Sequence, residues 1–467
     1  MRNSLKRGEF SNGRFSGRGA AIRDRAYSLE TSDDSNVASA NVVRFQPPVP
    51  EADERDGARA LRPRVALYSH DTMGLGHMRR NLLLAQTLAA PPVRAVVLMI
   101  AGARRAGIFA LPDGADCMIL PALHKGTDGQ YSARRLDVSL RDLIALRSKT
   151  ICAALEEFEP EVLIVDNVPR GAVGELNASL EYLRSRGTTR CVLGLRDVLD
   201  DPAVVKREWR RAANEEAIRD FYDAVWVYGD PAVYDLTREY QLSPDVTRKV
   251  RYTGYLDQRL RLELAKAEGV EPHAEFDLPS EPFVLCMLGG GQDGVLLAEA
   301  FAAAELPPGH IGVILTGPFM SRAAQQRLRR LASPRLRVLE FVAEPTLLLQ
   351  RAARVIAMGG YNTTCEMLSF EKRALLVPRV RPRQEQMIRA ERLRDLNLLD
   401  VLHPDALSPR ALSEWLAAPP QPLPPVRDLL VLDGLARLPQ LLDELLAAPP
   451  VVQTLSSQRS LRANVHS

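Results

Sequence analysis

Short runs of β-branched and other apolar residues recur along the chain, and each run is followed by a stretch with helical patterning. Alternation of this kind is typical of a parallel sheet that is covered by helices on both faces. The runs form two series, separated by a gap between residues 260 and 282. They lie at residues 65–69, 96–100, 118–120, 162–166, 191–195 and 225–229, and then at 283–288, 311–317, 336–342, 354–360 and 374–380.

Two series of runs predict an α/β fold with two tandem Rossmann-like domains that face an interdomain cleft. We place the N-terminal domain at residues 63–259, the linker at 260–282 and the C-terminal domain at 283–420. In such sheets, ligands bind at the carboxyl ends of the strands, where the N-termini of the following helices point inward. Polar motifs directly after the apolar runs are therefore the candidate functional residues.

The two ends of the chain differ from these domains. Residues 1–62 are rich in Ser, Arg, Gly and Asn without sustained periodicity, which predicts a disordered tail. Its basic start is compatible with contact to an anionic lipid or polymer as well as with a solvated tail. Residues 421–467 open with a Pro-rich segment, and we predict one helix in this tail, at about 434–447.

Composition excludes several classes of protein. The chain has 61 Lys and Arg against 58 Asp and Glu, so it shows no general nucleic-acid footprint. Its longest apolar run in the body, residues 95–103, is shorter than the about 18 residues that a membrane span needs. The first residues lack the apolar core of a signal peptide.

The five cysteines indicate a reducing, cytoplasmic compartment. They are scattered and odd in number, and no Cys and His cluster has the spacing of a zinc site. Four of them lie in apolar or helix-like segments, where Cys behaves as a small buried hydrophobe. No Asp-x-Asp pair occurs in the body of the chain, and we expect no metal and no other cofactor. The cysteines are Cys117, Cys152, Cys191, Cys286 and Cys365.

The first glycine-rich turn, SHDTMGLGHMRRN, spans residues 69–81. Gly74 and Gly76 permit a tight turn, and a helix that begins near His77 offers backbone N–H groups to an anion. His77 would project into the cleft, where a neutral imidazole can deprotonate a hydroxyl nucleophile. A capping or hydrogen-bonded structural histidine is the alternative, and the turn alone does not decide between them.

A second glycine-rich turn, LGGGQDG, spans residues 288–294. Gly289, Gly290, Gly291 and Gln292 stand between a strand and a helix, which favours close approach of a phosphate or a sugar to the backbone. A tight turn without a ligand is the alternative.

The third motif, MGGYNTTCEML at residues 358–368, is the most specific. Two glycines end an apolar run, and the next residues supply capping side chains and N–H donors that suit a pyrophosphate. Glu366 falls one turn into the helix, where its carboxylate can bind the two ribose hydroxyls. An N-cap followed by a first-turn acid is the structural alternative. The candidate donor-binding residues are Gly359, Gly360, Asn362, Thr363, Thr364 and Glu366.

The fourth motif, PRVRPRQEQMIRA, spans residues 378–390. Glu385 and Gln386 open a helix, and a carboxylate beside an amide can hold the vicinal hydroxyls of a sugar. Arg383 and three further arginines add positive charge near a diphosphate, although a solvated helix start would read in the same way.

Polar residues end two runs of the N-terminal half. Asp166 and Asn167 follow one run, and Arg196 and Asp197 follow another. Asp166 is placed to orient His77 across the cleft, which makes these two the candidate catalytic residues. Strands also commonly end in polar residues that have no catalytic task.

Taken in order, these motifs resemble those of the GT-B glycosyltransferase superfamily, and within it the branch containing the peptidoglycan N-acetylglucosaminyltransferase that makes lipid II. The pattern also looks like a family of predicted bacterial glycosyltransferases. The resemblance covers about residues 64–415 and is specific at Gly76 and His77, at residues 359–366, and at Glu385 and Gln386.

The resemblance implies a role for each motif. The first glycine turn, with His77 and Arg80, faces the acceptor, and Phe341 with Val342 contacts the base. The turn at residues 359–363 contacts the diphosphate and the following glutamate holds the ribose. The acidic residue and glutamine of the fourth motif hold the donor sugar.

Two positions depart from the lipid-II enzyme. Arg80 stands where that enzyme typically has proline, and Glu385 with Gln386 replaces its Gln-Gln pair, as in small-molecule glycosyltransferases. A peptidoglycan acceptor is therefore not implied. The acceptor stays open between a lipid-linked molecule and a polysaccharide, with peripheral contact to the inner face of the membrane as one option.

The sequence therefore predicts metal-independent transfer of a sugar, expected to be UDP-linked, to an acceptor hydroxyl. Two alternatives remain. Gly-His-x-x-Arg also occurs in nucleotide-sugar hydrolases of this fold, so hydrolysis or epimerisation of a nucleotide sugar is one. A non-catalytic nucleotide-sugar-binding protein is the other.

Overall fold

The computed structural model describes residues 62–70, 76–102, 111–126, 130–267, 280–291, 293–340, 342 and 344–448. The chain divides into two units, Met1–Ala58 and Arg59–Ser467, and every described residue belongs to the second unit. The tail predicted at residues 1–62 lies outside the described residues except for Arg62. Residues 268–279 of the predicted linker and residues 449–467 of the C-terminal tail also lie outside them.

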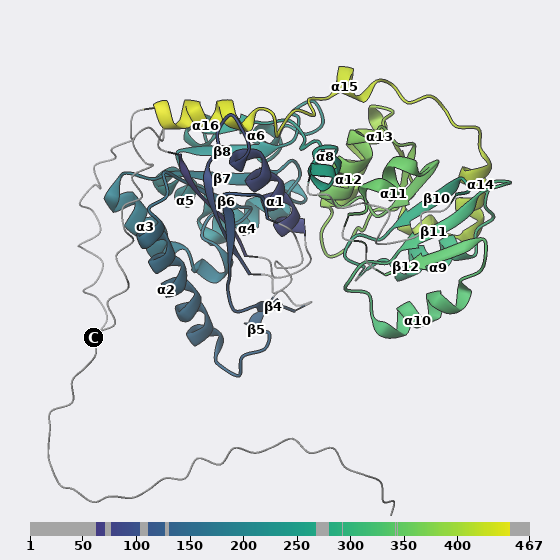
Figure 1. Ribbon diagram of the computed structural model, residues 1–467, viewed down its shortest axis with the longest axis horizontal. Helices are drawn as coiled ribbons and strands as arrows, with labels where there is room; N and C mark the ends of the chain where they lie inside the picture. Colours follow the sequence, from purple (N-terminus) through teal and green to yellow (C-terminus); the bar gives the residue numbers. More distant parts are fainter. Residues whose placement is uncertain are drawn as a thin grey trace, which may run out of the picture. The chain divides into compact units, whose positions relative to one another are not determined.

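Seven parallel strands form the first sheet, in the order β3-β2-β1-β6-β7-β8-β9 (Figure 1). The six predicted runs of the N-terminal half all fall on its strands, whereas β9 and the antiparallel pair β4 and β5 have no counterpart in the sequence prediction. The strands are β1 (Arg64–Ser69), β2 (Val96–Ala101), β3 (Ala115–Ile119), β4 (Leu123–Lys125), β5 (Tyr131–Ala133), β6 (Val162–Asp166), β7 (Arg190–Arg196), β8 (Ala224–Tyr228) and β9 (Val250–Tyr252).

Helices cover both faces of this sheet because the residues of each strand alternate between them. Val65 and Leu67 of β1 belong to one apolar cluster with α1, and Ala66 and Tyr68 belong to another with α2 and α3. The helices of this part are α1 (Gly76–Ala89), α2 (Leu140–Phe158), α3 (Asn177–Arg186), α4 (Pro202–Ala212), α5 (Asn214–Phe221), α6 (Leu236–Glu239) and α7 (Pro244–Thr247). The helix α8 (Leu260–Ala267) follows them and contacts the helices of the second sheet.

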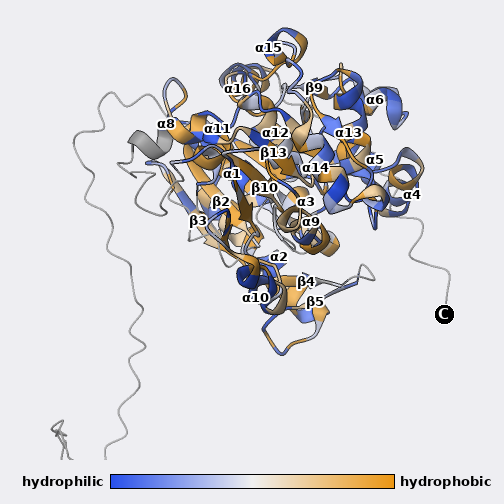
Figure 2. Ribbon diagram, turned by 90° about the vertical axis from the view of Figure 1, so that its right-hand side faces the viewer, coloured by the Kyte–Doolittle hydropathy of each residue, from blue (hydrophilic) through white to orange (hydrophobic). Residues whose placement is uncertain are grey.

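Six parallel strands form the second sheet, in the order β12-β11-β10-β13-β14-β15. Its strands are β10 (Phe283–Met287), β11 (Ile311–Leu315), β12 (Leu336–Leu339), β13 (Arg354–Ala357), β14 (Ala374–Leu376) and β15 (Asp400–Val401). Its helices are α9 (Val295–Ala302), α10 (Arg322–Leu331), α11 (Thr346–Arg351), α12 (Tyr361–Ser369), α13 (Glu385–Asp395) and α14 (Pro409–Ala417). The strands are mostly hydrophobic (Figure 2), because helices bury both faces. The predicted pair of Rossmann-like sheets is confirmed, and we refer to each sheet with its helices as the first and the second domain.

The C-terminal segment returns to the first domain, which the sequence did not reveal. It contains α15 (Val426–Leu429) and α16 (Leu438–Ala447), and α16 lies beside α1 (Figure 1). Four leucines of α16 spaced for one helical face, at positions 438, 441, 442 and 445, join the apolar cluster of α1. The Tyr255 backbone N–H donates to the Val431 carbonyl at 2.8 Å, so the segment is attached by its backbone as well.

Both sheets reverse their strand order beside their first strand. In the first sheet β2 and β6 flank β1, and in the second β11 and β13 flank β10. The crevice at such a reversal is where ligands bind in open parallel sheets. The turns after β1, β10 and β13 are the first three glycine motifs of the sequence, so the fold places them at these two crevices.

Candidate active site

His77, Arg80 and Asp166 form one contact network at the carboxyl edge of the first sheet. His77 and Arg80 lie one turn apart on α1, and Asp166 is the last residue of β6. His77 Nδ1 is hydrogen-bonded to Asp166 Oδ2. Arg80 Nη2 donates to both carboxylate oxygens, at 2.6 Å to Oδ1 and 2.7 Å to Oδ2. The network joins two motifs that are 89 residues apart in the sequence.

The charge state of Asp166 determines the tautomer of His77. Burial opposes ionisation of Asp166, but the charge of Arg80, with hydrogen bonds from His77 and Arg80, holds the pKa of this carboxyl well below its ordinary value. An ionised carboxylate only accepts hydrogen bonds, so His77 Nδ1 carries the proton. The other ring nitrogen, Nε2, is then unprotonated in the neutral ring. His77 is 17% exposed, which leaves the ring reachable from the pocket.

Arg80, which was expected to belong to the acceptor loop, is buried and held in place by aromatic rings. Its side chain is 2% exposed, and its guanidinium lies over the rings of Tyr228 and Tyr361, 5.9 and 5.5 Å from their centroids. Burial by itself lowers the pKa of Arg80, but Asp166 raises it above the ordinary value. Arg80 thus stays charged under the histidine and contacts the second domain through Tyr361.

The N-terminus of α12 opens onto the same site. Its N-cap is Gly360, which provides no side-chain hydrogen bond to the helix. Asn362, expected to be a capping side chain, instead donates from Nδ2 to the Gly76 carbonyl at 3.0 Å and links the third motif to the first. Thr364 is fully buried and its hydroxyl donates to the Gly359 carbonyl at 3.3 Å. The first N–H groups of a helix have no partner within the helix, so this end can receive an anion.

Glu366 is held one turn further along α12 by an arginine. Arg261 of α8 donates to Glu366 Oε1 at 2.7 Å and to Glu344 Oε1 at 2.9 Å. Only 2% of the Glu366 side chain is exposed. The second carboxylate oxygen, Oε2, accepts no hydrogen bond from the described residues, and Glu366 lines the pocket.

The glycines of the second and third motifs do not all serve one purpose. A Cβ added at Gly289 or Gly360 would meet nothing within 4 Å, so both leave open space at the pocket. A Cβ at Gly291 would lie 2.2 Å from the Thr316 carbonyl oxygen, and the φ of Gly291 is +87°. Gly291 is therefore required for packing of the turn, whereas Gly289 and Gly360 leave room for a ligand.

Glu385 and Gln386 lie at the start of α13 and face the pocket. Arg379 Nη2 donates to Glu385 Oε1 at 2.8 Å, and Gln386 Oε1 accepts from the Arg379 backbone N–H at 3.0 Å. Glu385 Oε2 is buried and has no hydrogen-bond partner among the described residues. A buried carboxylate oxygen without a donor is uncommon in proteins and indicates that a ligand or water supplies one.

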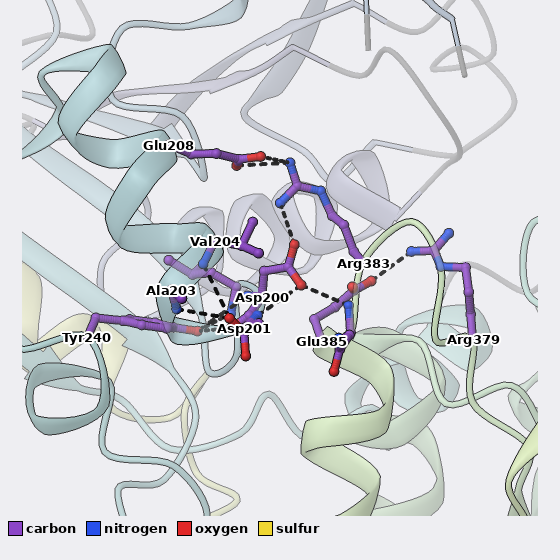
Figure 3. Close-up of polar contacts among 11 residues, drawn as sticks. Asp200, Asp201, Ala203, Val204, Glu208, Tyr240, Arg379, Arg383 and Glu385 are labelled. Atoms are coloured by element: carbon purple, nitrogen blue, oxygen red, sulfur yellow. Dashed lines mark hydrogen bonds and ion pairs between the residues drawn. The ribbon is translucent and has the colours of Figure 1, made fainter. Parts of the chain in front are cut away.

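Arg383 lies away from the pocket wall, where it binds the first domain (Figure 3). Its guanidinium donates to Asp200 at 3.1 Å and to Glu208 at 3.1 and 3.3 Å. Asp200 lies just before α4 and Glu208 lies within it, and Asp201 caps the helix by accepting from the backbone N–H of Ala203. The structure therefore places Arg383 in an interdomain ion pair.

One pocket of about 270 Å³ brings most of the predicted residues together. The predicted residues on its wall are Gly76, His77, Arg80, Gly289, Gly290, Val342, Gly360, Asn362, Thr363, Glu366, Glu385 and Gln386. Those away from the wall are Asp166 (behind His77), Gly291, Gly359, Thr364 and Arg383. Gly74, Gln292 and Phe341 lie outside the described residues.

The chain is similar in structure to CalG4, the calicheamicin glycosyltransferase, with a TM-score of 0.54 and 16% identity over 83% of this chain and 100% of that chain. It is also similar to UDP-GlcNAc 2-epimerase from Neisseria meningitidis bound to UDP-GlcNAc, with a TM-score of 0.51 and 13% identity over 83% of this chain and 94% of that one. The fold is GT-B. At such low identity the likeness shows the fold alone, which transferases and epimerases share.

Sequence comparison adds one weaker match. The chain is 21% identical over 250 residues to an uncharacterized glycosyltransferase of Methanosarcina acetivorans, a match that covers 50% of this chain and 58% of that protein. It thus spans little more than half the length of this curated relative. No protein-family model matches the chain.

The described residues contain neither a metal-binding cluster nor a membrane-spanning helix. No group of three or more His, Cys, Asp or Glu side chains among them is arranged to hold a metal ion. No helix in that part of the chain is both long and apolar enough to cross a membrane.

Several pocket residues are not among the predicted site residues, although Arg379 was one of the arginines expected to add charge near the diphosphate and Arg196 was noted as the end of a strand. Arg79, Arg196, Phe319, Tyr361 and Arg379 all line the pocket. Tyr361 occupies the position of the third motif at which the resemblance specifies no residue type, so it received no role. Its ring stacks on Tyr255 with the centroids 6.4 Å apart. The signal that could have identified the arginines is their position directly after strands or in the first turn of a helix.

Proposed function

We propose that the chain transfers a sugar from a nucleotide diphosphate sugar, with UDP as the expected nucleotide, to an acceptor hydroxyl. The observation that carries this proposal is the set of residues that line the pocket described above. Two glycine turns and a helix N-terminus line it from the second domain, and His77, held by Asp166, lines it from the first. The former suit a diphosphate leaving group and the latter suits a base.

The proposed donor would lie in the second domain, with its diphosphate, ribose and base against three different parts of the pocket wall. The diphosphate would lie at the N-terminus of α12, where Gly289 and Gly360 leave space and backbone N–H groups can donate. Glu366 Oε2 would accept from the ribose hydroxyls while Oε1 stays on Arg261. Val342, which is apolar and lines the same pocket, would contact the base.

The donor sugar would lie against the start of α13. The unpartnered Glu385 Oε2 would accept a hydrogen bond from a sugar hydroxyl, and this contact would remove the cost of leaving that oxygen unsatisfied. Gln386 would add a side-chain amide beside it. This placement puts the sugar between the diphosphate and the first domain.

The chemical step follows from the tautomer of His77. Its unprotonated Nε2 takes the proton of the acceptor hydroxyl as the acceptor oxygen bonds to the anomeric carbon. The bond from that carbon to the diphosphate oxygen breaks, and its electron pair leaves with the diphosphate. Backbone N–H groups of α12 stabilise the developing charge. Asp166 keeps Nδ1 protonated and stabilises the imidazolium that forms, as the carboxylate of a catalytic triad does.

Hydrolysis or epimerisation of a nucleotide sugar is the second candidate, and Arg80 is the observation that favours it. Arg80 is held by Asp166 beneath His77, so the Gly-His-x-x-Arg pattern shared with hydrolases is a fixed unit of this site. In hydrolysis a water molecule would occupy the acceptor position next to His77.

A turnover assay separates these functions. The protein is incubated with a panel of UDP-sugars, with and without cell extract, while UDP is measured by chromatography and the sugar by NMR. Transfer predicts UDP release that depends on the extract. Release of UDP and free sugar without extract would establish hydrolysis, and a changed sugar without UDP release would establish epimerisation. Tight binding of UDP-sugars without any turnover would identify a binding protein instead.

A further inference from the structure

Most of the charged side chains that surround the pocket in the described part of the chain form ion pairs. The pairs are Arg80 with Asp166, Arg389 with Asp197, Arg379 with Glu385 and Asp293, and Arg261 with Glu366 and Glu344. Arg196 also lines the pocket, but within the described part of the chain it forms no ion pair and no side-chain hydrogen bond. Its charge is therefore left without a counter-ion at the pocket wall.

Arg196 is fixed in this position by the first sheet. It is the last residue of β7, in register with Tyr228 of β8, and its Nε is buried without a partner. Burial, followed by the nearby charge of Arg80, lowers the pKa of Arg196 from its ordinary value. The side chain of Arg196 is partly buried. A partly buried charge that lacks a partner destabilises the fold unless something else compensates for it.

In the second domain, Glu385 lacks a hydrogen-bond donor for one of its carboxylate oxygens. Its Oε1 is bonded to Arg379, but its Oε2 is buried without a donor. Arg196 and Glu385 influence each other electrostatically, yet no ion pair joins them. A ligand between them that offers an anionic oxygen to Arg196 and a hydroxyl to Glu385 would satisfy both side chains.

We propose that Arg196 binds a carboxylate or phosphate group of a substrate, in addition to the nucleotide diphosphate at α12. This proposal rests on the proposed function, because Glu385 is there the residue that holds the donor sugar. A guanidinium presents a planar pair of donors that matches either anion, and Arg is suited to such bidentate contacts. The anion has two possible sources: a uronic acid as the donor sugar, or an anionic group beside the acceptor hydroxyl.

Calorimetric titrations with UDP, UDP-glucose and UDP-glucuronic acid test the first source. Wild-type protein, Arg196→Gln, Arg196→Lys and the control Arg207→Gln, which removes an exposed arginine of α4, are compared. If the donor carries the anion, the wild type binds UDP-glucuronic acid about 10-fold more tightly than UDP-glucose, the scale of a hydrogen bond to a charged group. Arg196→Gln abolishes this preference, Arg196→Lys retains part of it, and Arg207→Gln retains all of it.

Titration with glycerol 3-phosphate, with and without saturating UDP, tests the second source. If the acceptor carries the anion, the wild type and Arg207→Gln bind this probe alongside UDP and Arg196→Gln does not. Arg196→Gln should melt no lower than the wild type, since it removes an unpaired charge, and this confirms that the variant is folded.

Two results would overturn the proposal. One is a wild type that shows neither preference nor probe binding. The other is an Arg196→Gln protein whose affinity for UDP itself falls as much as its affinity for the UDP-sugars, because Arg196 would then belong to the diphosphate site. A wild type that does not bind UDP refutes the proposed function instead, and the probe titration without UDP still decides whether Arg196 holds an anion.

Discussion

Both domains contribute to the pocket the start of a helix that follows a strand, but the side chains there differ. In the first domain, charged side chains fill the site, with Arg80, Asp166 and His77 in mutual contact. In the second domain, Gly289 and Gly360 leave open space, and α12 begins without a side-chain cap. This contrast is what we expect if one domain fixes a reactive side chain and the other receives a ligand on its backbone.

The comparison predicts that changes in the first domain impair chemistry or folding, whereas changes in the second impair ligand binding. His77→Ala should have the largest effect. Its kcat should fall by about 10²–10⁴-fold, the usual contribution of a positioned general base. Its affinity for UDP should change little, because the proposed diphosphate contacts lie in the second domain.

Steady-state kinetics and UDP titration of His77→Ala check this prediction. His403→Ala is the matched control, since His403 is 52% exposed and does not line the pocket. Near-normal turnover in a folded His77→Ala protein would remove the base from the mechanism, and Asp166 would lose its proposed role as well.

Arg80→Ala should have the next largest effect, on stability. It leaves Asp166 buried without its cationic partner, which typically costs about 3–5 kcal/mol in the free energy of unfolding. Because the pKa of Asp166 is lowered in the fold, the ion pair stabilises the protein above about pH 4 and its contribution is lost below that pH. The deficit of the variant should therefore shrink as the pH falls below 4.

Urea unfolding at pH 7 and at lower pH measures this deficit. Arg392→Ala, which removes a partly exposed ion pair with Glu239, should cost at most about 1 kcal/mol. Equal losses in the two variants would show that the Arg80 network contributes no more than a surface pair.

Glu366→Ala should weaken UDP binding by about 1.5–3 kcal/mol, because it removes the proposed hydrogen bonds to the ribose. Glu344→Gln is the control, since Glu344 shares Arg261 but is not on the pocket wall. Calorimetric titration of both variants shows whether the carboxylate acts directly. Equal loss of affinity in both would mean that Glu366 acts only by holding Arg261.

The smallest effects are expected from two glycine substitutions. One glycine leaves space for a ligand and the other is required for packing of a turn. Gly360→Ala has room for its Cβ and a φ of −59°, so its melting temperature should not fall. Its affinity for UDP should drop, because the methyl group enters the pocket. Gly291→Ala should lose about 1–3 kcal/mol of stability through backbone strain and its overlap with the Thr316 carbonyl. Thermal melting and UDP titration of the pair would contradict this distinction if both variants lost only stability.

Local sequence patterns predicted most of the strands and helices. They did not predict the shortest strands or the packing of the C-terminal helix on the first domain. The eleven apolar runs are strands, and most of them are followed by a helix; the exceptions among the described elements are β2, which is followed by β3, and β3, which is followed by β4 and β5. Strands such as β9 and β15 are three and two residues long, too short for a periodicity to emerge. The leucines of α16 show an amphipathic helix, but nothing in the sequence states which domain it covers.

For the candidate site, the sequence predicted well which residues lie close together. It predicted less well which hydrogen bonds and ion pairs they form. Asp166 and His77 lie in contact as expected, but both stand at the edge of the first sheet and not on opposite sides of the cleft. Arg383 could not be placed, because its partner Asp200 is 183 residues away in the other domain. Arg196 was visible as a strand end, but its missing counter-ion appears only when the surrounding charges are located in space.

The measurement that tests the division between the domains most directly is calorimetric titration of UDP into three proteins side by side. We predict that the wild type and His77→Ala bind UDP with the same affinity and that Gly360→Ala binds it about 10-fold more weakly. A wild type that does not bind UDP would contradict the proposed donor site. Loss of UDP binding in His77→Ala together with full binding in Gly360→Ala would place the nucleotide in the first domain and reverse the assignment.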